Sequence, residues 1–220
     1  MKKLVLATAL VAAFSSQVMA ASNSGTAGIG TTTAGKATDD STPGQNSGVV
    51  RFQGKVVDQT CTIDGNSQDQ IVVLDTVSKN RFTATEKTAM PTPFDIQLIG
   101  CTVNQAGTNK ATRVKARFSS VANVDTANNY TLRNTKPVNA GGAANVNIQL
   151  FNEDGTTAIA PMQRTTSGTP PKHQSNDGAI FKEIKAQNQI LHYVAKYYAT
   201  APTVGVGEVE SAVDFELTYE

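Results

Sequence analysis

Two cysteines are the residues of this chain whose side chains can most readily react with each other. Cys61 and Cys101 are the only cysteines in the sequence. In an oxidising compartment such a pair forms a disulfide, and closing a loop of about 40 residues would stabilise a fold by roughly 4 kcal/mol. Zinc binding is the alternative, but two cysteines without a nearby histidine or carboxylate cluster make a poor zinc site. The sequence therefore predicts a disulfide, and we expect neither a metal nor another cofactor.

Side chains suited to catalysis are few. The two histidines are His173, in a proline-rich stretch, and His192, on the outward side of an alternating segment. Histidines at such positions are more often solvated surface residues than general bases or metal ligands. The sequence contains no Gly-x-Ser-x-Gly elbow, no His-Glu-x-x-His motif and no phosphate-binding loop. We therefore do not expect an enzyme.

The composition points to another protein surface as the partner. The chain has 220 residues, a formal net charge of +1 and no tryptophan. This length suits one domain. A charge near zero gives no reason to expect nucleic acid or an anionic membrane as the partner.

The N-terminus has the features of an export signal. Met1-Lys2-Lys3 precedes an apolar run and the small-residue site Val18-Met19-Ala20, which predicts a signal peptide over residues 1–20. The apolar run is too short to span a bilayer, so we expect no membrane insertion after its removal. Residues 21–47 are rich in Ser, Thr and Gly and lack hydrophobic periodicity, which predicts a flexible leader.

The rest of the chain consists of short segments in which apolar and polar residues alternate, the pattern of half-buried strands. We expect strands within residues 70–77, 94–101, 113–118, 130–132, 144–151, 189–200 and 207–220. Pro91 and Pro93 argue against a regular strand where they lie, and residues 160–178 are predicted to form a long surface loop. Such a series of strands joined by turns predicts an all-β sandwich of immunoglobulin-like type.

One alternating segment, residues 48–57, has no obvious place in that sandwich. Its apolar face consists of Gly48, Val50, Phe52, Gly54 and Val56, and its other face is mostly polar. Because it follows the flexible leader, we hypothesise that it completes a neighbouring molecule. The alternative is that it forms the ordinary first strand of a complete sandwich.

These patterns together resemble the pilin subunits of chaperone-usher fimbriae, in particular the type 1 and P pilus group. The resemblance runs from Gly48 to Glu220 and rests on Gly48-x-Val50-x-Phe52-x-Gly54-x-Val56-Val57, Cys61, the sequence Phe-Asp-Ile-Gln-Leu-x-x-Cys ending at Cys101, and a penultimate Tyr219. It implies an incomplete immunoglobulin-like sandwich that lacks its seventh strand and is completed by donor-strand exchange. It also implies that residues 48–57 are the donor strand and 58–220 the pilin domain.

The resemblance also assigns residues and partners. The donor residues that face the groove would be Gly48, Val50, Phe52, Gly54 and Val56, and the acceptor and chaperone-binding strand would carry Val209, Val213, Phe215, Leu217, Tyr219 and Glu220. The implied partners are other copies of this chain or related pilins, a periplasmic chaperone and an outer-membrane usher. The implied location, after passage through the periplasm, is a surface fimbrium of a Gram-negative bacterium that supports cell adhesion. A minor or adaptor pilin, or an exported carbohydrate-binding sandwich, is the alternative function.

Overall fold

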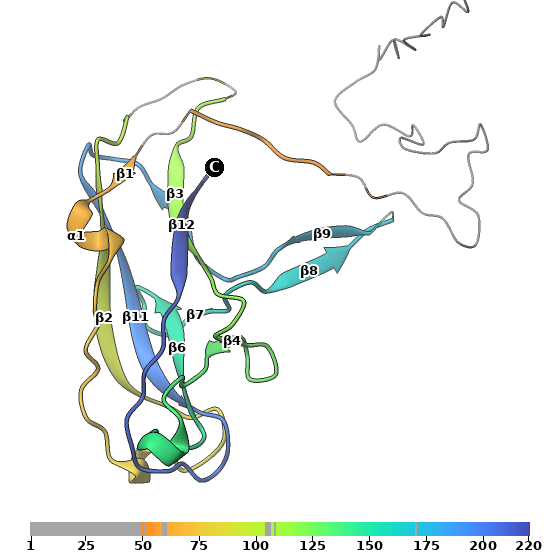
Figure 1. The fold of residues 1–220 in the computed structure, drawn as a ribbon. Helices are drawn as coiled ribbons and strands as arrows, with labels where there is room; N and C mark the ends of the chain where they lie inside the picture. Colours follow the sequence, from red (N-terminus) through yellow and green to blue (C-terminus); the bar gives the residue numbers. More distant parts are fainter. Residues whose placement is uncertain (1–49, 51, 59–60, 104–106, 108, 170) are drawn as a thin grey trace, which may run out of the picture. The chain divides into compact units, whose positions relative to one another are not determined.

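The computed structural model describes residues 50, 52–58, 61–103, 107, 109–169 and 171–220 (Figure 1). The predicted signal peptide, the predicted leader and Gly48 lie outside the described residues. The chain divides into two units, Met1–Lys55 and Val56–Glu220. Residues 52–58 are in neither a helix nor a strand. Among the described residues, no helix is both long and apolar enough to cross a membrane.

The larger sheet of the second unit is antiparallel throughout. Its strands are ordered β1-β2-β11-β6-β5-β4, and β7 also pairs with β6. Their bounds are β1 Thr62–Ile63, β2 Thr88–Ile99, β4 Val124–Asp125, β5 Thr131–Leu132, β6 Val146–Asn152, β7 Ala158–Ile159 and β11 Gln189–Ala199. The long strands β2, β11 and β6 form its centre, and along β11 the buried residues Leu191, Tyr193 and Ala195 alternate with more exposed ones, as in a half-buried strand.

A smaller antiparallel sheet has the order β10-β3-β12, with β10 at Lys182–Glu183, β3 at Arg113–Ser119 and β12 at Asp214–Tyr219. β3 and β12 lie side by side (Figure 1), paired from Asp214 opposite Ser119 to Tyr219 opposite Val114. Within the described residues, the other edge of β12 has no partner strand. The remaining elements are the hairpin of β8 (Arg164–Ser167) and β9 (Lys172–Ser175), the short helix α1 (Gly65–Gln68) and the 3-10 turns η1 (Lys79–Arg81) and η2 (Val138–Ala140).

The two sheets enclose one core made by the residues that alternation placed inward. Members from both sheets are buried, including Ile96, Leu98, Val114, Ala116, Phe118, Leu191, Tyr193 and Ala195. The ring of Phe118, on the small sheet, meets the ring of Tyr193, on the large sheet, edge to face at a centroid distance of 5.1 Å. Aromatic pairs of this geometry add to the stability that burial provides. The prediction of an all-β fold is confirmed.

The predicted disulfide is present. Cys61 and Cys101 are bonded, and their Cα atoms lie 4.0 Å apart. The bond joins the residue before β1 to the chain just beyond the end of β2, and both cysteines are buried. It therefore fastens the start of the domain to the long strand β2.

The expectation that Pro91 and Pro93 exclude a strand was wrong. Both lie within β2, which pairs with β11 through a register shift between Ala195 and Tyr197. Met90 has a φ of 53°, so the extra residue of this bulge lies next to Pro91. β2 pairs with β1 only through Leu98 and Ile99, so the proline-containing part has one side without a partner strand, where a missing N–H donor is tolerated.

Three further expectations differ from the structure. Residues 70–78 form no strand, and the region 160–178 contains the β8–β9 hairpin where a loop was predicted. The last strand is shorter than residues 207–220, because β12 begins at Asp214 and ends at Tyr219. Val209, Val213 and Glu220 therefore lie outside it. The hairpin is almost entirely exposed, so it has no apolar periodicity by which the sequence could reveal it.

Candidate functional site: an apolar groove with two open edges

An open groove of about 700 Å³ lies between the two sheets of the second unit. Its floor is apolar and comes from β2, β3, β5, β6 and β11, through Phe94, Ile96, Phe118, Leu132, Ile148, Leu150 and Ala195. These residues belong to or pack against the main core. The groove therefore runs along the hydrophobic core, and of its floor residues only Phe94 is more than slightly exposed.

The first edge of the groove is the chain from Ser67 to Leu74, which begins in the second half of α1 and continues beyond it. Asp64 caps α1 by accepting a hydrogen bond from the Asn66 N–H at 3.0 Å, and the turn places Ser67 against β2. There the Ser67 Oγ accepts from the backbone N–H of Gln97 at 2.9 Å, and Gln70 Nε2 donates to the Asp95 carbonyl at 3.2 Å. Side chains, rather than a strand ladder, hold this edge.

Apolar residues alternate along this edge although it is not a strand. Val72 and Leu74 are half-buried, whereas Ile71 and Val73 are 90% and 79% exposed, and Ile71 lines the groove together with Val72 and Leu74. The pattern is that of a strand with one face packed, and it explains why residues 70–77 were predicted to be one. What is missing is a neighbouring strand.

The second edge runs from Ser211 to Phe215 and leads into β12. A loop holds the chain before it, because the Glu208 N–H donates to the Gly141 carbonyl at 2.9 Å and the Ala143 N–H donates to the Glu208 carbonyl at 2.8 Å. Gly207 has a φ of 149°, and a Cβ there would lie 2.5 Å from the Gly141 oxygen, so this crossing requires glycine.

The structure brings only part of the predicted acceptor set to the groove. Val213 and Phe215 line it. Val209, Leu217 and Tyr219 are half-buried and pack against the core without lining the groove. Sequence reasoning missed the whole first edge and the floor residues of β5 and β6, and the β-branched run 70–77 was the one signal for that edge.

The chain end beyond the groove is held in place by polar contacts. The side-chain carboxylate of Glu220 lies 3.0 Å, through its Oε2, from Arg113 Nη1, and the Glu220 N–H donates to the Arg113 carbonyl at 3.0 Å. The Tyr219 hydroxyl donates to the Cys61 carbonyl at 3.1 Å, and burial raises the pKa of this hydroxyl, which therefore stays protonated. The last strand is thus tied to the disulfide-linked start of the domain.

The predicted donor residues that the structure describes are exposed. Val50, Phe52 and Val56 are 77%, 94% and 93% exposed. No atom lies within 4 Å of where a Cβ on Gly54 would be. Apolar side chains at such exposure are a liability unless a partner covers them.

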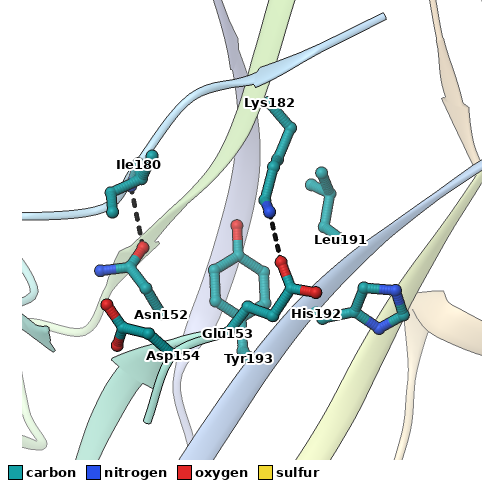
Figure 2. Close-up of a pocket in the computed structure, with 8 residues that line it drawn as sticks. All are labelled: Asn152, Glu153, Asp154, Ile180, Lys182, Leu191, His192 and Tyr193. Carbon is teal, nitrogen blue, oxygen red and sulfur yellow. Dashed lines mark hydrogen bonds and ion pairs between the residues drawn. The ribbon is translucent and has the colours of Figure 1, made fainter. Parts of the chain in front are cut away.

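A second, smaller pocket of about 130 Å³ lies beside β10 and β11 (Figure 2). Figure 2 shows Lys182 pointing toward Glu153, with which it forms an ion pair, and Asn152 Oδ1 accepting from the Ile180 N–H at 2.9 Å. His192 lies at its rim, exposed as predicted, with Nδ1 2.7 Å from Asp95 Oδ1. The polar groups of this pocket already have partners, either within it or among adjacent residues, and its small size suits a surface depression.

Comparisons with protein families, individual relatives and solved structures all indicate the same family. A family model described as fimbrial protein matches residues 50–220. A major fimbrial subunit of Haemophilus influenzae is 41% identical over 199 residues, which cover 84% of this chain and 92% of that protein. The crystal structure of the P pilus rod subunit PapA is similar with a TM-score of 0.53 at 20% identity, covering 74% of this chain and 100% of that one. A chain of a solved chaperone-usher pilus is similar with a TM-score of 0.50 at 23% identity, covering 81% and 99%.

Proposed function

Because the chain belongs to the fimbrial protein family, we propose that it polymerises by inserting residues 48–57 of one copy into the groove of the next. The chain is a structural subunit of a surface fimbria, and its fold is the incomplete immunoglobulin-like fold of chaperone-usher pilins. The assembly joint and its residues are the new part of this proposal. The observation that carries it is the apolar groove with two unpaired edges.

The groove and the segment complement each other in hydrogen bonding and in apolar surface. An inserted strand would run between the unpaired backbone of residues 68–74 and the open edge of β12, so main-chain hydrogen bonds would form on both sides. Each such bond contributes about 1 kcal/mol net. Burying Val50, Phe52 and Val56 against the floor would contribute roughly 1.5 to 3 kcal/mol each. These contributions make a stable joint from surfaces that are otherwise exposed.

The same surfaces support a proposed route of the subunit through the cell. An open core groove in a free subunit would bind other apolar chains, so a periplasmic chaperone would cover the groove until an outer-membrane usher exchanges it for the next subunit. The disulfide supports this route, since such bonds form in oxidising compartments. We propose signal peptide 1–20 and leader 21–47 as the segments that precede the donor strand.

The variant Gly54→Arg tests the joint. Gly54 has open space around it in the subunit, so an arginine there is compatible with folding, but it would face the groove floor in the joint. The matched control is Gln53→Arg, which adds the same side chain to the adjacent outward-facing position. We expect cells expressing Gly54→Arg to accumulate folded subunits without fibres, and the control to make normal fibres. Normal fibres from Gly54→Arg, seen by electron microscopy, would overturn the assignment.

A further inference from the structure

The rim of the groove carries one carboxylate on each edge. Asp69, on the first edge, and Asp214, on the second, are both exposed and both line the groove. No lysine, arginine or histidine is among the described residues that line it. In the part of the chain that the structure describes, neither carboxylate forms an ion pair. The mouth of the groove is therefore negatively charged.

Asp214 stands out because the other carboxylates near the end of the chain have basic partners. Lys136 Nζ lies 3.0 Å from Glu208 and 3.2 Å from Glu210. Glu220 pairs with Arg113, and Glu216 lies opposite Arg117 in the β12–β3 register. Asp214 lies opposite Ser119, which carries no charge. Asp214 therefore has no cation directly opposite it in the β12–β3 ladder.

The segment that would occupy the groove carries the opposite charge on its outer face. Between residues 48 and 57 the charged residues are Arg51 and Lys55, and none is acidic. Arg51 lies outside the described residues and enters here by its sequence position. Because side chains alternate along a strand, a segment that buries Phe52 and Val56 turns Arg51 and Lys55 outward, to the mouth where Asp69 and Asp214 lie.

We propose that Asp69 and Asp214 recognise the two cations of the donor segment from a second copy of this chain, and that they set its register and identity. This inference rests on the proposed function, because it requires residues 48–57 in the groove. Because the apolar residues of the donor segment recur at every second position, the segment could shift by two residues along the groove and still bury apolar side chains. Such a shift would move its two cations away from the fixed carboxylates of the groove. Exposed ion pairs add little affinity, but complementary charge guides encounter and disfavours wrong partners. The groove thus prefers donors that have a basic outer face.

Charge reversal in full-length chains tests this pairing. The donor variant is Arg51→Glu with Lys55→Glu, the groove variant is Asp69→Lys with Asp214→Lys, and the swapped chain carries all four changes. A matched control, Glu153→Lys with Glu183→Lys, makes the same charge change at exposed positions outside the groove. Each chain is expressed as the only pilin in its cells, and fibre-borne subunits are measured after shearing.

We expect the donor and groove variants each to lower fibre-borne subunits by about fivefold, the effect of about 1 kcal/mol in an exposed ionic contact. The swapped chain should recover most of the loss, and the control should match the unchanged chain. Loss in both single-sided variants without recovery in the swapped chain, or no loss in either, would overturn the pairing. Failure of Gly54→Arg to stop fibre growth would instead overturn the joint itself, so the two failures are distinguishable.

Discussion

The segment 50–56 and the segment 213–219 have the same alternation of apolar and polar side chains, but only one of them is paired. Val213, Phe215, Leu217 and Tyr219 are half-buried, and β12 forms a ladder with β3. Phe52 and Val56 are more than nine-tenths exposed and belong to no strand. A periodic pattern therefore predicts a strand without saying in which molecule its partner lies.

The largest expected effect concerns the disulfide at the start of the domain, just ahead of the first edge of the groove. The variant Cys61→Ser with Cys101→Ser removes the bond that fastens the start of the domain, and its free energy of unfolding should fall by about 4 kcal/mol. Urea denaturation of the oxidised chain measures it. As a control, reductant should lower the stability of the unchanged chain and leave the variant unaffected. Equal denaturation midpoints for the two oxidised chains would show that the disulfide does not stabilise the domain.

Matched truncations test the comparison between the two segments directly. Phe215→Ala should lower the free energy of unfolding of the subunit by about 2 kcal/mol, because its half-buried ring packs near Phe118 at a centroid distance of 6.2 Å. Phe52→Ala should change it by less than about 0.5 kcal/mol, since its ring is exposed. Both variants should form weaker fibres. An equal loss of subunit stability would mean that Phe52 is packed within its own chain.

A smaller effect is expected where β12 meets the start of the domain. Tyr219→Phe removes the hydrogen bond to the Cys61 carbonyl and should lower the free energy of unfolding by about 1 kcal/mol. Thermal unfolding at neutral pH measures this, with Tyr130→Phe as a control. If the Tyr219→Phe chain were as stable as the unchanged one, this hydrogen bond would not contribute to holding β12 in place.

The smallest effect is a dependence on pH. Burial raises the pKa of the Tyr219 hydroxyl above its ordinary value of 10.0. The unfolded chain then loses this proton at a lower pH than the folded chain, so the stability it contributes is present below pH 10 and is lost as pH rises through the folded pKa. Tyr219→Phe should make the decline of the unfolding midpoint above pH 10 shallower. An identical decline in both chains would contradict this.

The sequence predicted most of the long strands that build the core. Alternation placed Ile96, Phe118 and Tyr193 in the core, because a strand whose sheet packs on one face buries every second residue. It failed for β2, where a bulge and an unpaired side accommodate two prolines. Proline excludes a strand only where its missing N–H is needed, and that depends on the tertiary arrangement.

The groove was only half predictable for a related reason. Phe215 and Val213 were assigned from the alternation of the last segment and the family resemblance, but the first edge was interpreted as an ordinary strand from the run 70–77. Its residues have the composition of a strand and lack a paired neighbour in the structure. Local patterns carry no information on whether the adjacent position in a sheet is occupied. The charges of Asp69 and Asp214 likewise acquire meaning only once both edges are seen around one groove.

The structure of the assembled fibre by electron cryomicroscopy tests the central claim most directly. We predict that residues 48–57 of one subunit form a strand between residues 68–74 and 211–215 of its neighbour, with Phe52 buried on the groove floor and Gly54 close to it. A groove filled by residues 48–57 of its own chain, or left empty between subunits joined elsewhere, would contradict the account.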